Sequence, residues 1–149
     1  MAFSPPKVPV HQVEPETELY VPQPARIVRV EDVTPTEKLF EVELASGEPL
    51  GHAPGQFVQV FVPGIGEAPI SVASAPVGRT TFDMVVRRVG DVTSALHGMK
   101  AGDEIGIRGP FGRGFDVEEL KGLDVLFVGG GIGLVPLWGL IEAVLAERD

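Results

Sequence analysis

Short segments in which apolar and polar residues alternate make up the middle of the chain. Residues 25–31 (ARIVRVE) and 38–44 (KLFEVEL) place an apolar side chain at about every second position, which is typical of a strand with one buried face. A short helical pattern covers residues 93–99. Because turn-forming pairs that contain glycine separate the segments, we predict a six-stranded antiparallel barrel over residues 25–115. The other four predicted strands are residues 56–62, 69–74, 81–88 and 104–108.

The pattern changes after residue 115. Residues 125–128 (VLFV) are wholly apolar, which is typical of a strand covered on both faces in a parallel sheet. The glycine turn 129–133 (GGGIG) follows at once, and a helix is predicted over residues 136–148, with Pro136 suited to its first turn. We predict the opening β–α unit of a nucleotide-binding domain over residues 116–149. One strand and one helix leave apolar surface exposed, so either the chain is part of a longer protein or a partner chain completes the sheet.

Composition narrows the possible functions. Twelve basic and twenty-one acidic residues give a net charge of −9, so a nucleic-acid partner is not expected. The chain has no cysteine, which excludes disulfides and cysteine-bound iron–sulfur clusters within it, and its three scattered histidines predict no metal site. The longest apolar stretch, residues 134–146, is interrupted and too short to span a bilayer. The N-terminus carries no signal-peptide pattern, so we expect a cytoplasmic location without membrane contact.

The N-terminal residues 1–24 have a different texture. They carry six prolines and almost no periodic apolar pattern, which predicts an extended arm that could serve for docking.

Four motifs could carry chemistry, and each also has a plain structural explanation. The glycines of residues 129–133 let a backbone approach a phosphate or ribose at a helix N-terminus, but they also suit a tight turn. Residues 69–74 (PISVAS) place Ile70 and Ser71 on opposite faces of a strand, which can be an ordinary half-buried strand. Residues 90–94 (GDVTS) precede a short helix that Asp91 or Thr93 would cap. Residues 109–115 (GPFGRGF) form either a hinge beside a ligand or a simple linker.

Taken together and in this order, the motifs resemble the ferredoxin-NADP-reductase superfamily over residues 22–148. The likeness is closest to the gamma subunits of hydrogenases and sulfhydrogenases, which are related to the electron-transfer subunit of dihydroorotate dehydrogenase. The resemblance implies a six-stranded antiparallel FAD-binding barrel followed by the first β–α unit of the NAD(P)-binding domain. The segments that carry it are 22–27 (PQPARI), 54–57 (PGQF), 66–71 (GEAPIS), 90–93 (GDVT), 109–115 (GPFGRGF) and 129–136 (GGGIGLVP).

The resemblance also implies where cofactors would bind. The isoalloxazine ring and ribityl chain of FAD would lie along residues 68–71, with Ser71 at the reactive edge of the ring. Residues 85–87 would contact the ribityl or phosphate region, residues 92–93 the pyrophosphate, and residues 129–133 the nicotinamide nucleotide. The implied binding residues are Ala68, Pro69, Ile70, Ser71, Val85, Val86, Arg87, Val92, Thr93, Gly129, Gly130, Gly131, Ile132 and Gly133.

The implied activity is electron transfer. Hydride would pass between NAD(P)H and FAD, and single electrons would pass on to an iron–sulfur or hydrogenase-type partner subunit. A [2Fe-2S] cluster is expected only in a missing C-terminal part or in the partner. Two alternatives stay open: a non-catalytic flavin-binding or docking subunit of a redox complex, and a barrel that binds no cofactor.

The chain departs from the superfamily at the flavin strand. Where the superfamily often has Arg-x-Tyr-Ser, this chain has Ala68-Pro69-Ile70-Ser71 and so lacks the arginine and the tyrosine. Arg87 or Arg88 would then supply the charge that a pyrophosphate requires. The resemblance favours FAD over FMN, and NADH and NADPH stay equally open.

Overall fold

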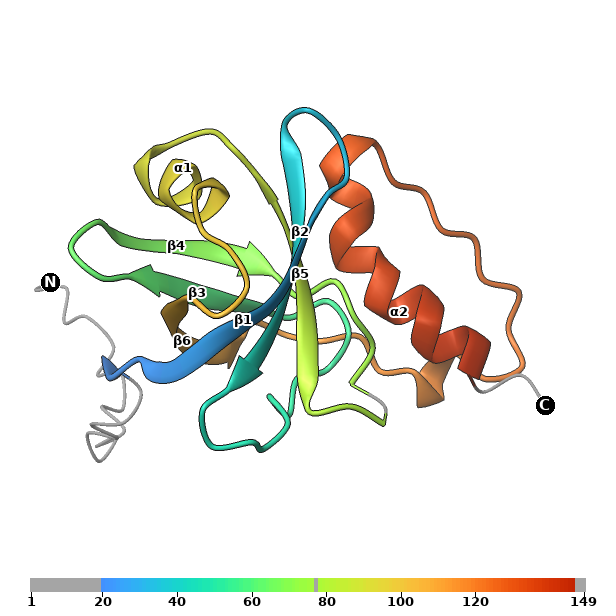
Figure 1. Cartoon of the computed structure of the whole chain (residues 1–149). Helices are drawn as coiled ribbons and strands as arrows, with labels where there is room; N and C mark the ends of the chain where they lie inside the picture. Colours follow the sequence, from blue (N-terminus) through green and yellow to red (C-terminus); the bar gives the residue numbers. More distant parts are fainter. Residues whose placement is uncertain (1–19, 77, 147–149) are drawn as a thin grey trace, which may run out of the picture.

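The computed structural model describes residues 20–76 and 78–146, and within them one antiparallel sheet dominates (Figure 1). Its strand order is β4-β3-β6-β1-β2-β5. Helix α1 (Asp91–His97) lies between β5 and β6, and helix α2 (Val135–Ala146) follows the short 3-10 turns η2 (Glu118–Leu120) and η3 (Gly131–Leu134). The strands are β1 (Gln23–Asp32), β2 (Glu37–Leu44), β3 (Phe57–Val62), β4 (Gly66–Ser71), β5 (Thr81–Arg87) and β6 (Glu104–Phe111).

The sheet closes into a barrel through the chain that follows β4. Val72 and Met84 form an antiparallel bridge between the two edges of the sheet. The Ala73 N–H donates to the Asp83 carbonyl oxygen at 2.7 Å, which adds a hydrogen bond to this seam. The six predicted strands are therefore confirmed, and so is their closure. Each observed strand begins and ends within three residues of its prediction.

Alternation along the strands determines the core. On β2 the side chains of Phe40 and Val42 are fully buried, and on β5 those of Phe82 and Met84 are fully buried, whereas their neighbours are partly exposed. Leu96 from α1 joins the same cluster. Full burial of each such side chain contributes about 1.5–3 kcal/mol, so this cluster is a main source of the barrel's stability.

The predicted strand over residues 125–128 does not form. Residues 124–130 have no regular structure, and Leu126 and Val128 are 85% and 80% exposed. A parallel strand exists only when a neighbour accepts and donates its backbone hydrogen bonds, and no strand of the described residues lies beside this one. The segment runs along α2 on the side away from the barrel (Figure 1). Val125 and Phe127 line a cavity of about 550 Å³ between this segment and α2.

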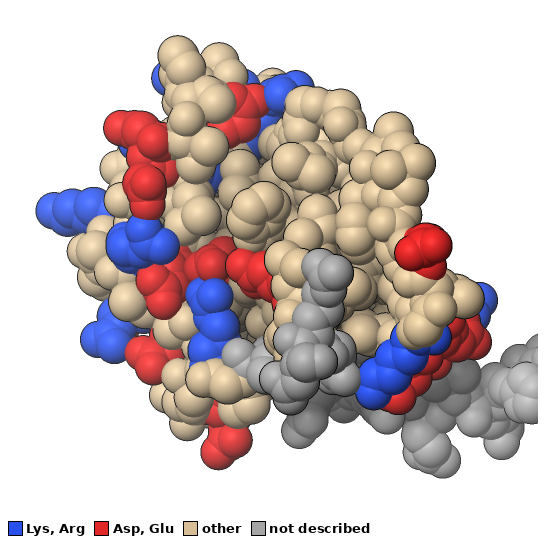
Figure 2. Space-filling view, turned by 90° about the vertical axis from the view of Figure 1, so that its right-hand side faces the viewer, with Lys and Arg blue, Asp and Glu red and all other residues tan. Residues whose placement is uncertain are grey.

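The predicted helix over residues 136–148 is confirmed as α2, which begins one residue earlier than predicted and is described as far as Ala146. The face that carries α2 is uneven in charge: charged side chains gather on one side of it and the rest is largely uncharged (Figure 2). Leu134, Trp138 and Leu145 contribute exposed apolar surface, as expected for an incomplete β–α unit. The first nineteen residues of the predicted arm lie outside the described residues, and Gln23 and Pro24 belong to β1.

Candidate functional site

A cavity of about 410 Å³ separates the barrel from the glycine turn and the start of α2. Val85 and Arg87 of β5 line it on the barrel side, and Gly131 and Ile132 line it on the other. Two motifs that are far apart in the sequence therefore share one cavity. Its remaining walls are mostly apolar and include Trp138. A mostly apolar cavity with a few charged groups at its edge is typical of a cofactor site.

The glycine turn is tight at some positions and open at others. A Cβ on Gly129 would lie 3.1 Å from the Cα of Leu134, and Gly131 has a φ of +54°, so the turn itself requires glycine at these two positions. A Cβ on Gly130 or Gly133 would meet nothing within 4 Å. The turn geometry alone therefore does not explain all four glycines, and the open positions leave room for a ligand to approach the backbone.

Arg87 is neutralised by a carboxylate that the sequence did not point to. Glu37 lies opposite Arg87 in the β2–β5 register, and the two form an ion pair. The carboxylate of Glu37 also accepts hydrogen bonds from the hydroxyls of Thr34 and Thr36. These hydroxyls, followed by the Arg87 guanidinium, lower the pKa of Glu37 to about 2. Within the described residues Arg88 has no ion-pair partner, so of the two arginines it is the one with an unbalanced charge.

The pKa of Glu37 predicts a specific loss of stability in acid. Because its folded pKa of about 2 lies below the ordinary value of 4.5, the ionised carboxylate stabilises the fold above pH 4.5, and this contribution disappears as the pH falls toward 2. The melting temperature of Glu37→Gln should therefore be lower than that of the wild type at pH 6, and the difference should shrink below pH 4.5. Glu48→Gln, at an exposed position, is the control. A difference that is constant from pH 6 to pH 2.5 would contradict the assignment.

The predicted flavin strand, β4, leads to the cavity through Ala73 but does not line it. Ile70 packs against the barrel core while Pro69 is exposed and Ser71 half-buried, so the predicted division of faces is confirmed. The strand β4 is at the edge of the sheet, where a proline without an N–H is tolerated. None of residues 68–71 lines the cavity itself; Ala73, just beyond β4, does.

Two of the predicted binding side chains already make contacts within the protein. Val86 is 1% exposed and belongs to the core, so a ligand would meet only its backbone. The hydroxyl of Thr93 accepts from the N–H groups of Val89 and Gly90, at 3.0 and 2.9 Å, and donates to the Gly90 carbonyl. Thr93 therefore caps α1 from its third position, and Asp91, the first residue of the helix, does not. Val92 is half-buried next to the start of β4.

The segment after β6 is tied to the loop before β3. The Phe115 N–H donates to the Pro54 carbonyl at 2.8 Å, and the Gln56 side-chain amide donates to the Gly112 carbonyl at 2.7 Å. A Cβ on Gly55 would lie 2.6 Å from the Phe115 ring. Contacts between the motifs at 54–57 and 109–115 thus hold the chain in place where it leaves the barrel.

Sequence reasoning missed three side chains near the cavity: Glu37, Trp138 and Glu142. The cross-strand partner of Arg87 becomes visible only when the register of β2 and β5 is known. Trp138 is the single tryptophan of the chain and follows Pro136 by two residues, which was a usable signal. In the described part of the chain no cluster of metal-ligating side chains occurs, and none of its helices is long and apolar enough to cross a membrane. The cytoplasmic location stays a prediction.

Comparisons with known proteins agree with this arrangement. Residues 24–115 match the family described as the oxidoreductase FAD-binding domain. Sulfhydrogenase 1 subunit gamma of Pyrococcus furiosus is 39% identical over 146 residues, which are 95% of this chain and 49% of that protein. A probable electron transfer subunit of dihydroorotate dehydrogenase B from Methanothermobacter thermautotrophicus is 47% identical over 94 residues, 63% of this chain and 34% of its own. The chain therefore spans half or less of the length of these curated relatives.

A solved structure shows the same fold. The cytochrome P450 reductase GcoB of Amycolatopsis superposes with a TM-score of 0.74 at 32% sequence identity, over 85% of this chain and 39% of that protein. The likeness extends beyond the barrel, because the barrel alone occupies a smaller share of the chain.

Proposed function

Because this chain belongs to the oxidoreductase FAD-binding domain family, we propose that residues 25–115 form an FAD-binding barrel and that residues 116–149 begin a nicotinamide-nucleotide-binding domain. The protein is an oxidoreductase module for electron transfer. Its electrons pass from NAD(P)H to FAD and then to an iron–sulfur partner, as in a hydrogenase-type gamma subunit. Supporting relatives are named as gamma and electron-transfer subunits.

The observation that carries this proposal is the shared cavity. The residues that line it come from β5 on one side and from the glycine turn on the other, so a flavin on the barrel and a nucleotide on the turn would meet there. The apolar walls suit a planar ring system, and the open space beside Gly130 and Gly133 suits a phosphate or ribose. The residues present therefore fit the cofactors that the family implies.

Each element of the chain has a defined task in this proposal. Residues 68–71 support the isoalloxazine ring, with the Ser71 hydroxyl at its edge, and residues 85–87 flank the ribityl chain. The backbone of residues 92–93 faces the pyrophosphate, and residues 129–133 hold the nicotinamide nucleotide. FAD, when bound, supplies the exchange between hydride and single electrons. The protein positions the two ligands and keeps water from the apolar part of the cavity.

The charge for the pyrophosphate comes from Arg88 rather than Arg87 in this proposal. Arg87 is already paired with Glu37, so its use by a phosphate would require breaking that ion pair. Arg88 is the residue directly after β5 and is exposed. Its backbone N–H donates to the Thr36 carbonyl oxygen at 3.0 Å. Its guanidinium is therefore available at a fixed point of the backbone.

We expect the purified protein to be yellow or to quench the fluorescence of added FAD. Arg88→Ala should weaken FAD binding about tenfold because a charge-assisted hydrogen bond to phosphate is lost, and Arg87→Ala should weaken it less. Fluorescence titration of the apoprotein with FAD, and with FMN in parallel, measures both effects. A colourless protein that does not quench FAD would remove the flavin proposal. Equal losses in the two variants would remove the choice of Arg88. In a version with a complete nucleotide-binding domain, FAD binding without reduction by NADH or NADPH would favour a non-catalytic flavin-binding subunit.

A further inference from the structure

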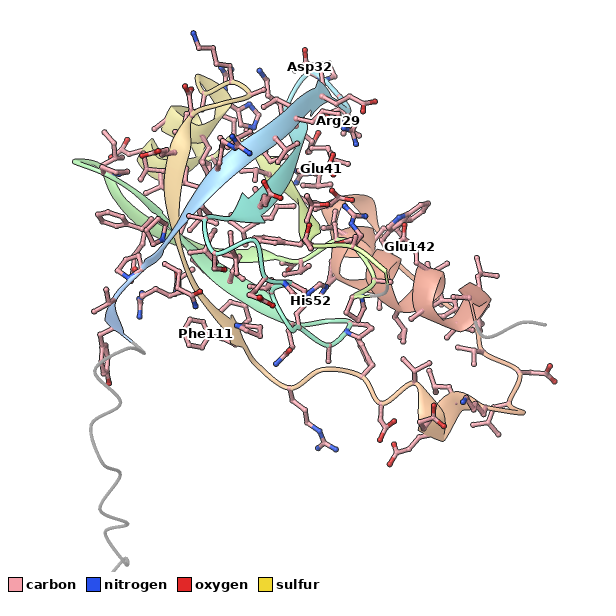
Figure 3. The ribbon with its side chains drawn as sticks, turned by 60° about the horizontal axis from the view of Figure 1, so that its bottom comes forward. Arg29, Asp32, Glu41, His52, Phe111 and Glu142 are labelled. Carbon is pink, nitrogen blue, oxygen red and sulfur yellow. The ribbon has the colours of Figure 1, made fainter. Side chains whose placement is uncertain are left out.

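Helix α2 is joined to the barrel by a side chain that the proposed function does not use. The Glu142 carboxylate accepts the Ala75 N–H at 2.9 Å with one oxygen and the Trp138 indole N–H at 2.9 Å with the other. Ala75 belongs to the short segment 73–75 that follows β4, so the contact links α2 to the barrel seam. Figure 3 labels Glu142 on α2 and His52 in the loop on the barrel side of this joint.

The segment that receives Glu142 is held to the barrel by further hydrogen bonds. The Ser74 hydroxyl accepts the Asp83 N–H at 3.0 Å, which ties the segment to β5. The Ser74 carbonyl oxygen accepts a hydrogen bond from His52 Nε2 at 2.9 Å, so that this nitrogen carries the proton. Burial lowers the pKa of His52, which favours the neutral ring. The barrel therefore presents a hydrogen-bonded backbone to the helix.

The helix also comes unusually close to this backbone. A Cβ on Gly139 would lie 2.6 Å from the Ser74 carbonyl oxygen, and Leu140 and Ala143 are buried beside it. Glu142 lies three residues after Gly139, on the same face of the helix. Close approach at Gly139 and the hydrogen bonds of Glu142 thus determine together where α2 sits.

The start of α2 forms one wall of the cavity. The turn η3 runs directly into α2, and Trp138, which Glu142 holds by its indole N–H, forms part of the cavity wall. Any rotation of α2 would move Gly131 relative to Arg87, whose Nη2 atom would lie 3.8 Å from a Cβ at Gly131.

We propose that Glu142 is a positioning residue that fixes the glycine turn at its working distance from β5. It acts through α2 and Trp138 and does not itself line the cavity. This inference rests on the proposed function, because the turn is taken to hold the nicotinamide nucleotide.

The choice of a carboxylate has a chemical reason that variants can test. The two N–H groups are received by different oxygens of the Glu142 carboxylate. Glutamine keeps one acceptor oxygen, so Glu142→Gln should be intermediate. Leucine has a similar size and no acceptor, so Glu142→Leu leaves both N–H groups without their partner. Glu119→Leu, at an exposed position in η2, is the matched control.

The experiment uses FAD-loaded protein and three measurements: the first two are made on this chain, and the third on a version in which the nucleotide-binding domain is complete. Hydrogen–deuterium exchange reports on α2, emission of the single tryptophan reports on Trp138, and stopped-flow reduction of the flavin by NADH or NADPH reports on the nucleotide. In Glu142→Leu we expect α2 amides to exchange about tenfold faster, a shifted tryptophan emission, and an apparent nucleotide Kd raised about tenfold, because two hydrogen bonds are lost. FAD content should be unchanged, Glu142→Gln should lie between, and Glu119→Leu should match the wild type.

The outcomes test the Glu142 contact and the proposed function separately. Unchanged exchange and emission in Glu142→Leu would overturn the positioning contact. Faster exchange with an unchanged nucleotide Kd would show that the contact exists but does not set the turn, which also overturns the proposal. A wild-type protein with a complete nucleotide-binding domain that holds FAD and is not reduced by either nucleotide would overturn the proposed function, and the positioning role with it.

Discussion

Replacing Gly139 with alanine is expected to release α2 from the barrel while the barrel stays folded. The added Cβ would lie 2.6 Å from the Ser74 carbonyl oxygen and 2.9 Å from its carbon, closer than side-chain atoms approach backbone. Because His52 holds that carbonyl, the helix has to move instead. Overpacking of this kind costs about 1–3 kcal/mol. Hydrogen–deuterium exchange should show fast exchange in α2 and continued protection in β2 and β5.

The control for Gly139 is Gly98→Ala at the end of α1. There the new Cβ would make an ordinary contact at 3.4 Å with the Ala95 carbonyl oxygen, so little change is expected. If α2 in Gly139→Ala remained as protected as in the wild type, the close packing of the helix on Ser74 would be refuted. General loss of protection in the barrel would mean that the two parts unfold together.

The second large effect is expected at Gly131. Its φ of +54° is strained for alanine, and the space toward Arg87 is open enough for a Cβ. If a nicotinamide nucleotide occupies that space, Gly131→Ala in a full-length version should weaken NAD(P)H use about tenfold, equivalent to about 1.4 kcal/mol, with FAD content unchanged. Stopped-flow reduction of the flavin and the melting temperature should be measured on one preparation.

Gly131→Asn distinguishes a ligand's need for space from the turn's need for a left-handed backbone. Asparagine tolerates the left-handed conformation better than alanine but has a larger side chain. If the ligand needs the space, Gly131→Asn should impair NAD(P)H use at least as much as alanine does. If the turn needs only conformational freedom, asparagine should be the milder change, and the nucleotide assignment fails. Gly122 is exposed, its φ is +75°, and a Cβ there would meet nothing within 4 Å. Gly122→Ala therefore measures the cost of backbone strain alone.

The barrel could be predicted from the sequence because its signal is local. Alternation of Phe40 and Val42 on one strand, and of Phe82 and Met84 on another, follows from the two-residue period of a strand that buries one face. The division of faces at Ile70 and Ser71 was predictable for the same reason. The order of the motifs was enough to indicate the family, which the match over residues 24–115 confirms.

The apolar run at 125–128 shows what a local sequence pattern cannot predict. Its composition favours a buried strand, but backbone hydrogen bonds need a neighbouring strand, and the described residues offer none. The motif at 90–93 shows a second limit. Its residues suit both a helix cap and a pyrophosphate site, and only the structure shows that the Thr93 hydroxyl is used as a cap.

By itself, the sequence determined the barrel, the helices and the residue types available for flavin chemistry, because these depend on periods of two and 3.6 residues and on motif order. Only the tertiary structure decided which residues meet. The register of β2 against β5 pairs Glu37 with Arg87, and the seam after β4 brings Ala75 to Glu142. These contacts join residues 50 and 67 positions apart, and such pairings arise from how the barrel closes and how α2 docks on it rather than from any local pattern.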